Sequence, residues 1–401
     1  MKIGIIREGK TPPDSRVPLT PPQCAGLLNE QQIDLVVQQS PNRCYTDEEY
    51  AAAGVPLTTD VEGCEVLLGV KEVPIEQLLP NKTYFFFSHT IKKQAYNRNL
   101  LQAVLQKNIR LIDWETLTNR NNQRLIAFGR FAGMVGAHNA LVTYGLRTGA
   151  FSLKRMKDCY DYAEAKALYK QMEWPAVKIV LTGTGRVGNG AADVLRDMGI
   201  RQVSVPEFLT EHYEEAVFTQ LLCSDYATRL DHKPFSKPYF YKHPELHRSI
   251  FGPFTKVADI MINGIYWDNN APAFFTVEDM AHADFNIEVI ADVTCDIAPV
   301  SSIPSTLRAS TIADPIFGFN PNTGQEAVPH QVDVIDMMTI DNLPNELPRD
   351  ASAAFGEQFL RNILPELLNS DSEVITKATI TKDGALTRHF EYLRNYVEGI
   401  E

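Results

Sequence analysis

Several features that mark other protein classes are missing from this sequence of 401 residues. No apolar run approaches the roughly 18–20 residues that a transmembrane helix needs. The first apolar stretch, Ile3–Ile6, is flanked by Lys2 and Arg7 and is too short for the core of a signal peptide. Residues 397–401 match no retention, peroxisomal or prenylation signal. We therefore expect a cytoplasmic protein with no membrane partner.

Basic residues are in deficit. Thirty-eight Lys and Arg against fifty Asp and Glu give a formal net charge of −12. A protein that binds a phosphate backbone normally carries a basic stripe, and this sequence has none. We therefore expect no nucleic-acid partner. An anionic ligand has to be bound locally, by a few Arg or Lys side chains or by a helix N-terminus.

Cysteine and metal-ligand patterns are also sparse. The six cysteines lie far apart and include no C-x-x-C pair, whereas disulfide frameworks and structural zinc sites need closer spacing. His243 and His247 are four residues apart, but Pro244 disfavours an uninterrupted helix between them. We expect reduced thiols and no metal site.

The hydrophobic pattern that is present favours an α/β fold. Short apolar runs typical of buried strands alternate with amphipathic stretches in the first third of the chain. The expected strands are residues 2–7, 33–38, 65–70, 83–88 and 109–113. Helices are expected from Thr46, where Glu49 completes a capping-box spacing, and at about 91–107. Such alternation predicts parallel crossover units and a doubly wound sheet.

A second domain is expected in the middle of the chain. A helix at 131–148 leads into it, and its strands are expected at 177–181, 203–205, 259–263 and 287–293. The aromatic-rich, weakly periodic residues 208–256 are interpreted as an irregular insertion. A helix at 351–368 suggests that the chain then returns to the first domain.

The fold class predicted is therefore α/β, with two doubly wound Rossmann-like domains and a cleft between them. Residues 1–130 and about 320–401 would form a substrate and catalytic domain. Residues from about 131 to 319 would form a dinucleotide-binding domain. Interdomain clefts are common binding sites for small molecules.

The strongest single motif is the G-x-G-x-x-G sequence of Gly183, Gly185 and Gly188, which follows an expected strand and opens an expected helix. The three glycines would allow a tight turn, close approach of a pyrophosphate, and close packing of helix on strand. Glu207 lies near the position where an acidic residue would bind the adenosine ribose. The motif predicts a dinucleotide site; the alternative is a glycine-rich turn in a protein without cofactor.

Several segments, in chain order, resemble one protein family. Arg16–Pro21, Gly69–Pro74 and Phe87–Thr90 resemble the N-terminal signature shared by alanine dehydrogenases, transhydrogenase subunits and lysine-forming saccharopine dehydrogenases. Other segments resemble one branch, the lysine–2-oxoglutarate reductase domain of bifunctional aminoadipic semialdehyde synthases and the free-standing fungal saccharopine dehydrogenases. These segments are Leu79–Tyr84, Asn108–Asp113, Ala127–Gly129, Ile262–Trp267, Ile340–Pro344 and Ala378–Thr381.

The resemblance implies an NAD(P)-dependent oxidoreductase that interconverts saccharopine with lysine plus 2-oxoglutarate through an imine. These three small molecules would be its partners. NAD is the expected cofactor because the carboxylate of Glu207 would repel a 2′-phosphate. NADP is not excluded, because the reductase domains of this branch resemble NADPH users. The phosphate loop, Gly-Thr-Gly-Arg-Val-Gly, is intermediate between the two branches.

The resemblance assigns catalysis to Lys71 and His89. Each follows an apolar strand, and the carboxyl edge of a parallel sheet is where α/β proteins bind ligands. A lysine at the end of a buried strand is costly unless it is partnered or perturbed, and histidine titrates near neutral pH. Glu72 and Glu115 resemble the carboxylates that tune the lysine in the family. Without the resemblance, ordinary structural roles would be the better interpretation of both catalytic candidates.

Substrate and cofactor residues are carried over in the same way. Arg16 and Arg124 are the candidates for binding substrate carboxylates, and Gln94 and Phe128 match positions that line the same site. For the cofactor, the resemblance adds residues around the phosphate loop and at two strand ends. They are Gly183, Gly185, Arg186, Val187, Gly188, Glu207, Ile265 and Asp292.

Two alternative functions remain open on the sequence. The same scaffold could serve an alanine dehydrogenase or another opine-type amino-acid dehydrogenase, since Arg16, Lys71 and His89 would suit pyruvate as well. A catalytically silent dinucleotide-binding regulator is the second alternative, against which the presence of both Lys71 and His89 argues. The sequence predicts neither the direction of the reaction nor an oligomeric state.

Overall fold

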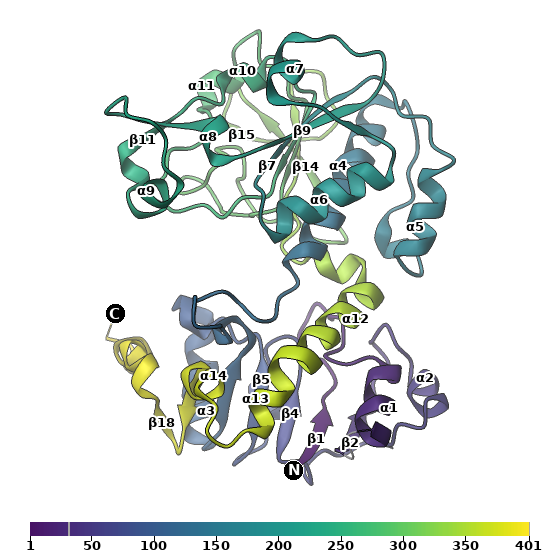
Figure 1. Ribbon diagram of the computed structural model, residues 1–401, viewed down its shortest axis with the longest axis vertical. Coiled ribbons are helices and arrows are strands. Elements are labelled where there is room, and N and C mark those ends of the chain that lie inside the picture. The colour runs from purple at the N-terminus through teal and green to yellow at the C-terminus, as the bar shows by residue number, and fades with distance from the viewer. Residues whose placement is uncertain (31–32, 401) are drawn as a thin grey trace. The chain divides into compact units, whose positions relative to one another are not determined.

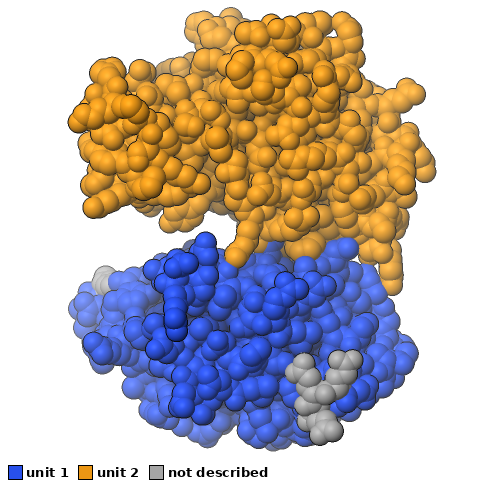
Figure 2. Space-filling model, in the orientation of Figure 1, with its two compact units in different colours: residues 1–128, 348–401 blue, residues 129–347 orange. Residues whose placement is uncertain are grey.

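The computed structural model describes residues 1–30 and 33–400. The chain forms two compact units, which Figure 2 colours separately. Unit 1 consists of residues 1–128 and 348–401, and unit 2 consists of residues 129–347. Within the described residues, no helix combines the length and the apolar character needed to cross a bilayer.

Unit 1 is built on an eight-stranded sheet in the order β18-β17-β6-β5-β4-β1-β2-β3. The strands from β6 to β3 are parallel, and the β17–β18 hairpin adds an antiparallel edge beside β6. Their bounds are β1 (Lys2–Ile5), β2 (Asp34–Gln38), β3 (Leu57–Thr58), β4 (Val66–Leu68), β5 (Thr83–Phe86), β6 (Arg110–Asp113), β17 (Thr379–Lys382) and β18 (Ala385–Leu386). The five strands expected from apolar runs in this part of the chain are all present, each a little shorter than expected.

Helices flank this sheet (Figure 1). They are α1 (Pro21–Glu30), α2 (Asp47–Ala52), α3 (Arg98–Gln106), α12 (Pro348–Gln358), α13 (Leu364–Leu368), α14 (Glu373–Ala378) and α15 (Arg394–Glu398). Thr46 caps α2 through the expected capping box with Glu49. The helix expected at 351–368 is a longer run in which residues 359–363 form a π-helical turn. Pro365 follows that turn, and its missing N–H explains why regular α-helical bonding is interrupted there.

Unit 2 contains a second eight-stranded sheet, in the order β15-β14-β16-β13-β12-β7-β9-β8. It is parallel from β16 to β8, with β14 and β15 as an antiparallel edge. The bounds are β7 (Lys178–Thr182), β8 (Arg201–Gln202), β9 (Val217–Leu221), β12 (Ile260–Asn263), β13 (Val289–Asp292), β14 (Ile316–Asn320), β15 (Gln325–Ala327) and β16 (Ile335–Met338). The two parallel-dominated sheets with flanking helices confirm the predicted α/β class with two Rossmann-like domains.

The helices of unit 2 include α4, which was expected at 131–148 and spans Gly129–Thr148. The others are α5 (Tyr162–Tyr169), α6 (Arg186–Asp197), α7 (Val205–Thr210), α8 (Cys223–Tyr226), α9 (Lys237–Lys242), α10 (Gly252–Thr255) and α11 (Val277–Met280). Helices α4 and α6 touch through their backbones. A Cβ atom at Gly133 would lie 1.8 Å from the carbonyl oxygen of Val187, and one at Gly190 would lie 2.1 Å from that of Arg130.

Three expectations about unit 2 were wrong. Residues 208–256 are not simply an irregular insertion, because β9 lies inside them and pairs directly with β7. The rest forms short helices and the two-stranded sheet of β10 (Ala227–Arg229) and β11 (His247–Ser249). The strand expected at 203–205 is replaced by β8 and the start of α7. The chain returns to unit 1 at Pro348 rather than near residue 320, because β14, β15 and β16 belong to the sheet of unit 2.

Candidate active site

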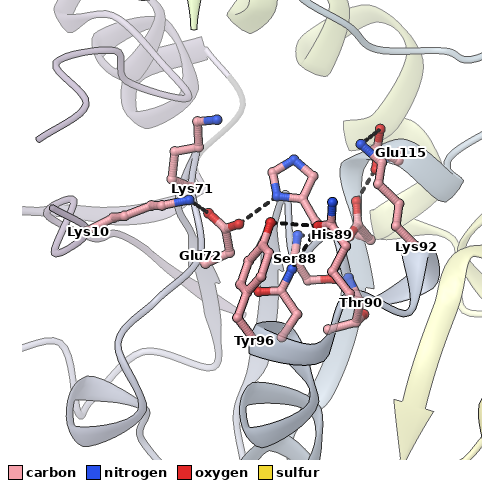
Figure 3. Close-up of polar contacts among 12 residues, drawn as sticks. Lys10, Lys71, Glu72, Ser88, His89, Thr90, Lys92, Tyr96 and Glu115 are labelled. Carbon is pink, nitrogen blue, oxygen red and sulfur yellow. Dashed lines mark hydrogen bonds and ion pairs between the residues drawn. The ribbon is translucent and has the colours of Figure 1, made fainter. Parts of the chain in front are cut away.

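The carboxyl edge of the sheet in unit 1 gathers a group of charged side chains. Parallel strands end at the same edge, so residues that follow β1, β4, β5 and β6 come close together. The charged and polar residues that follow these strands are Glu8, Lys10, Asp14, Arg16, Lys71, Glu72, Ser88, His89 and Glu115. Figure 3 shows the part of this group around Glu72 and His89.

His89 and Glu72 form the central contact. Nδ1 of His89 lies 2.6 Å from Oε1 of Glu72, and the ammonium of Lys10 donates to Oε2 at 2.7 Å (Figure 3). Burial by itself would raise the pKa of Glu72, but the hydrogen bonds from His89 and Lys10 lower it to about 2. Glu72 is therefore ionised at neutral pH. The ionised carboxylate accepts a hydrogen bond from Nδ1–H of His89, so Nε2 is the ring nitrogen left for proton exchange.

The backbone at His89 turns sharply after β5. Its φ is 53°, in the left-handed region that a residue other than glycine seldom adopts. The preceding residue, Ser88, is held by Asp113 at the end of β6, whose Oδ2 accepts hydrogen bonds from the Ser88 amide at 2.8 Å and its hydroxyl at 2.5 Å. Asp113 also accepts from the amide of Glu115 at 2.7 Å. Two neighbouring strand ends thus fix the turn that presents the imidazole.

Lys71 follows β4 and is partly buried beside this pair. Burial lowers the pKa of Lys71, and the positive charge of Arg16 lowers it further, while Asp14 and Glu72 act in the opposite direction. Within the described residues, the Lys71 ammonium makes no hydrogen bond or ion pair. A lysine in this environment loses its proton more readily than a solvated one, which is the property that a general base requires.

Arg16 is held in a side-on ion pair. Its Nε donates to Oδ1 of Asp14 at 2.9 Å and its Nη2 donates to Oδ2 at 2.6 Å. The guanidinium lies over the ring of Phe128, 4.3 Å from its centroid, and that ring stacks on Phe355 at 4.4 Å. Both members of the ion pair are buried, at 3 % and 2 % exposure. The site therefore contains an oriented guanidinium of the kind that binds carboxylates.

The remaining expected residues are placed around this centre. Oε1 of Glu115 accepts from Arg124 at 2.8 Å and lies 3.7 Å from the ammonium of Lys92, while its Oε2 is buried without a hydrogen-bond partner among the described residues. Gln94 is exposed, and its side-chain oxygen accepts from the hydroxyl of Tyr96 at 2.6 Å. Arg124 is thus bound to Glu115, whereas Gln94 is oriented by a local contact.

Sequence reasoning missed three charged residues that follow β1. Lys10 binds Glu72, Asp14 binds Arg16, and Glu8 binds the backbone of the Lys71 segment. The available signal was the cluster of charged residues directly after the first expected strand. Because parallel strands end at one edge, that cluster could have been placed beside Lys71 and His89.

The glycine loop of unit 2 fits a dinucleotide phosphate. Gly183 has a φ of +94°, and a Cβ there would lie 2.5 Å from the carbonyl oxygen of Gly264. A Cβ at Gly188 would lie 2.0 Å from the carbonyl oxygen of Gly183, whereas Gly185 has open space at the N-terminus of α6. Arg186 is exposed and Val187 partly buried at the start of this helix. These are the glycine roles of a pyrophosphate cradle.

Glu207 does not lie where the sequence suggested. It is the third residue of α7, and its exposed carboxylate accepts from the amide and hydroxyl of Ser204 in a capping box. The strand that pairs with β7 is β9, whose last residue Leu221 accepts from the amide of Gly183 at 3.2 Å. The first acidic residue after β9 is Asp225, which caps α8 by accepting from the amide of Leu222 at 2.7 Å.

Asp292 ends β13 inside a polar network. Its Oδ1 accepts from Asn263 at 2.9 Å and from the Thr294 hydroxyl at 2.6 Å, and its Oδ2 accepts from Thr306 at 2.7 Å. Asn263 in turn accepts from Thr182, so the ends of β7, β12 and β13 are tied together. Burial raises the pKa of Asp292, against the effect of these hydrogen bonds.

Ile265 lines a mainly apolar cavity in unit 2. The cavity has a volume of about 340 Å³ and lies beside the segments that follow β9 and β12. Its aromatic lining consists of Tyr226, Phe240, Tyr241, Tyr266, Trp267 and Phe274. Among residues 1–30 and 33–400, no group of three or more His, Cys, Asp and Glu residues is arranged to hold a metal ion.

Comparison with known proteins confirms the resemblance seen in the sequence. The family model "Alanine dehydrogenase/PNT, N-terminal domain" matches residues 4–135. The mitochondrial alpha-aminoadipic semialdehyde synthase of Mus musculus is 30% identical over 100% of the chain and 48% of its own length. The NAD(+), L-lysine-forming saccharopine dehydrogenase of Emericella nidulans is 25% identical over 90% of the chain and 91% of its own length. The chain spans less than half the length of the plant and mammalian relatives that it matches.

Solved structures share the fold. An L-alanine dehydrogenase superposes with a TM-score of 0.67 at 16% identity, covering 99% of each chain. A transhydrogenase from Sinorhizobium meliloti superposes with a TM-score of 0.57 at 15% identity, covering 96% of this chain and all of that one. At these identities the superpositions establish the architecture alone.

Proposed function

We propose that the protein is an NAD-dependent dehydrogenase, because residues 4–135 match the alanine dehydrogenase/PNT N-terminal domain and the chain is similar to lysine-forming saccharopine dehydrogenases. The reaction proposed is the interconversion of saccharopine with lysine plus 2-oxoglutarate. One observation carries the proposal. Lys71, whose pKa is lowered by burial, lies at the same edge of the sheet as the hydrogen bond between His89 and Glu72.

The condensation of an amine with a keto acid requires several proton transfers. The substrate ammonium has to lose a proton before its nitrogen attacks the keto carbon, and the carbinolamine hydroxyl has to gain one before it leaves as water. When bound, the nicotinamide cofactor supplies the hydride that reduces the imine carbon. The protein's own task is therefore proton transfer, orientation and binding of substrate carboxylates.

We assign the two acid–base roles to Lys71 and His89. Lys71 accepts the proton of the substrate ammonium, because burial lowers its pKa and so favours its uncharged form. His89 exchanges a proton at Nε2, since Glu72 holds Nδ1 and fixes the tautomer. Lys10 keeps Glu72 ionised from its other side.

Carboxylate binding is assigned to the arginines. Arg16, oriented by Asp14 and Phe128, has the planar shape that binds a carboxylate with two hydrogen bonds. Arg124 offers a second positive charge next to Glu115, and Gln94 a polar edge. An alanine dehydrogenase could use the same groups for pyruvate, which is the alternative function to be tested.

The purified protein is expected to oxidise NADH when lysine and 2-oxoglutarate are both present and to show no turnover with either substrate alone. The reason is that hydride transfer requires the condensed imine. The measurement is the loss of NADH absorbance with each single substrate and with the pair. Faster turnover with pyruvate plus ammonia than with lysine plus 2-oxoglutarate would replace the proposal with the alanine dehydrogenase function.

For the cofactor, we propose NAD bound over the Gly183–Gly188 loop, with the adenine ring in the cavity beside Ile265. The acidic residue that faces the ribose in this arrangement is Asp225, because it follows β9, the strand next to β7. Glu207 is assigned a capping role in α7.

Replacing Asp225 and Glu207 in separate variants tests the cofactor assignment. Asp225→Asn keeps an oxygen that can cap α8 but loses the charge that repels a 2′-phosphate, so its preference for NADH over NADPH should shrink. Glu207→Ala should leave that preference unchanged. The measurement is kcat/KM for NADH and NADPH in both variants and the wild type. A preference that depends on Glu207 and not on Asp225 would return the ribose to Glu207.

A further inference from the structure

The backbone hydrogen bonds between β1 and β4 stop one residue past the strands. The last of them runs from the amide of Ile6 to the carbonyl of Leu68, at 3.0 Å. Beyond this point the chain after β4 leads to Lys71, and the chain after β1 enters the charged segment 7–10. Among the described residues, the amides of Val70 and Lys71 make no hydrogen bond to the backbone of β1 or of another strand.

The side chain of Glu8 takes the place of a backbone partner. Its Oε1 accepts from the amide of Val70 at 2.6 Å, and its Oε2 accepts from the amide of Lys71 at 2.8 Å. On the opposite side, β5 still pairs with this segment, because the amide of Phe87 donates to the carbonyl of Val70 at 2.9 Å. Within the described residues, the bond to Glu8 is the one hydrogen bond that the Lys71 amide makes.

The surroundings of Glu8 disfavour the ionised form of its carboxyl group. Burial raises its pKa to about 8, and the nearby charge of Asp14 adds to that effect, while the amides of Val70 and Lys71 and the charge of Arg16 oppose it. A glutamate exposed to solvent at the end of a strand would not lose the hydration of its charged form. The carboxyl group is thus held against the segment that carries Lys71.

We propose that Glu8 is a positioning residue for Lys71: its carboxyl group accepts two hydrogen bonds from the segment after β4 and fixes the backbone from which the Lys71 side chain reaches the substrate. This inference rests on the proposed function only for the role of Lys71 in catalysis. No part of it requires Glu8 to touch a substrate. Misplacing a reacting group by about 1 Å can cost about 10²-fold in rate, which sets the scale of the expected effect.

The test compares Glu8→Gln with Glu49→Gln. In Glu8→Gln the side-chain oxygen can accept from one amide, but its NH₂ group then faces the other N–H donor. Glu49 is a matched control in the same unit, because its carboxylate also accepts from a backbone amide, that of Thr46 at 2.7 Å, and lies away from Lys71. We expect Glu8→Gln to lower kcat by about 10–100-fold with little change in the KM for NADH. Glu49→Gln should keep the wild-type kcat, and the melting temperatures of both variants are recorded.

A second readout does not depend on activity. Lysines are acylated at a series of pH values with a trace of an amine-reactive anhydride, and the modification of Lys71 and of half-exposed Lys92 is followed by mass spectrometry. Because burial is the main cause of the lowered pKa of Lys71, release of its backbone should move that pKa upwards in Glu8→Gln. The profile of Lys92 should not change.

The outcomes separate the inference from the proposed function. If Glu8→Gln lowers the melting temperature but leaves both kcat and the Lys71 profile unchanged, Glu8 only stabilises the sheet and the inference is overturned. If the wild-type protein does not turn over lysine and 2-oxoglutarate, yet the Lys71 profile still shifts in Glu8→Gln, the proposed function fails and the positioning role stands.

Discussion

Replacing Lys71 with methionine should lower kcat for lysine plus 2-oxoglutarate by about 10²–10⁴-fold, the usual cost of losing one acid–base group. Methionine preserves much of the apolar stem and removes the ammonium. Cofactor affinity should change little, because the phosphate loop belongs to unit 2. Steady-state kinetics measures kcat, and an NADH fluorescence titration measures cofactor affinity.

Lys82→Met is the matched control for this experiment. Lys82 precedes β5 and therefore lies at the opposite edge of the same sheet, where its ammonium donates to the carbonyl of Glu62. It should retain wild-type turnover. Near-normal turnover in Lys71→Met would show that Lys71 is a structural residue, and the assignment of the general base would have to move to another group.

The second large effect is expected on stability, from Gly133→Ala. A Cβ at this position would lie 1.8 Å from the carbonyl oxygen of Val187, and a backbone atom of the neighbouring helix has no rotamer with which to move away. Helices α4 and α6 would have to separate. Overpacking of this kind typically costs about 1–3 kcal/mol, and the rigid contact places the expected loss at the upper end of that range.

Gly26→Ala provides the opposite case. Gly26 lies in α1, and a Cβ there would meet no atom within 4 Å. Alanine in a helix interior is more favourable than glycine by about 0.5–1 kcal/mol, so this variant should be more stable than the wild type. Chemical denaturation of both variants gives the two free energies of unfolding. Equal stability of Gly133→Ala and wild type would show that α4 and α6 do not pack as closely as described.

The parts of the fold that could be predicted were those determined by local pattern. Buried strands could be recognised as apolar runs, and the capping box at Thr46 located the start of α2 to within a residue. β9 was missed because Thr219 and Gln220 interrupt its apolar run and the aromatic and histidine-rich sequence around it obscures the pattern. The return to unit 1 was misplaced for a different reason: an antiparallel strand such as β14 carries no local sign of which sheet it joins.

The candidate site was predictable only in part. Lys71 and His89 could be chosen because the resemblance pointed to two residues that also follow apolar strands. Glu8 and Lys10 act through contacts with residues far along the chain, and no local pattern specifies such contacts. The prediction that Glu207 follows the strand next to β7 was wrong. It assumed that the next strand in the sequence is also the next strand in the sheet.

The composition of unit 1 from two separate stretches of chain has a consequence for synthesis on the ribosome. β6 lies at the edge of the parallel strands until β17 pairs with it, and β17 is made only after the whole of unit 2. Until then, β6 exposes unpaired N–H and C=O groups, as any edge strand does. Unit 2 is one continuous stretch and is complete before that edge is covered. A nascent chain released before residue 379 would therefore keep an open, aggregation-prone sheet edge even with unit 2 folded.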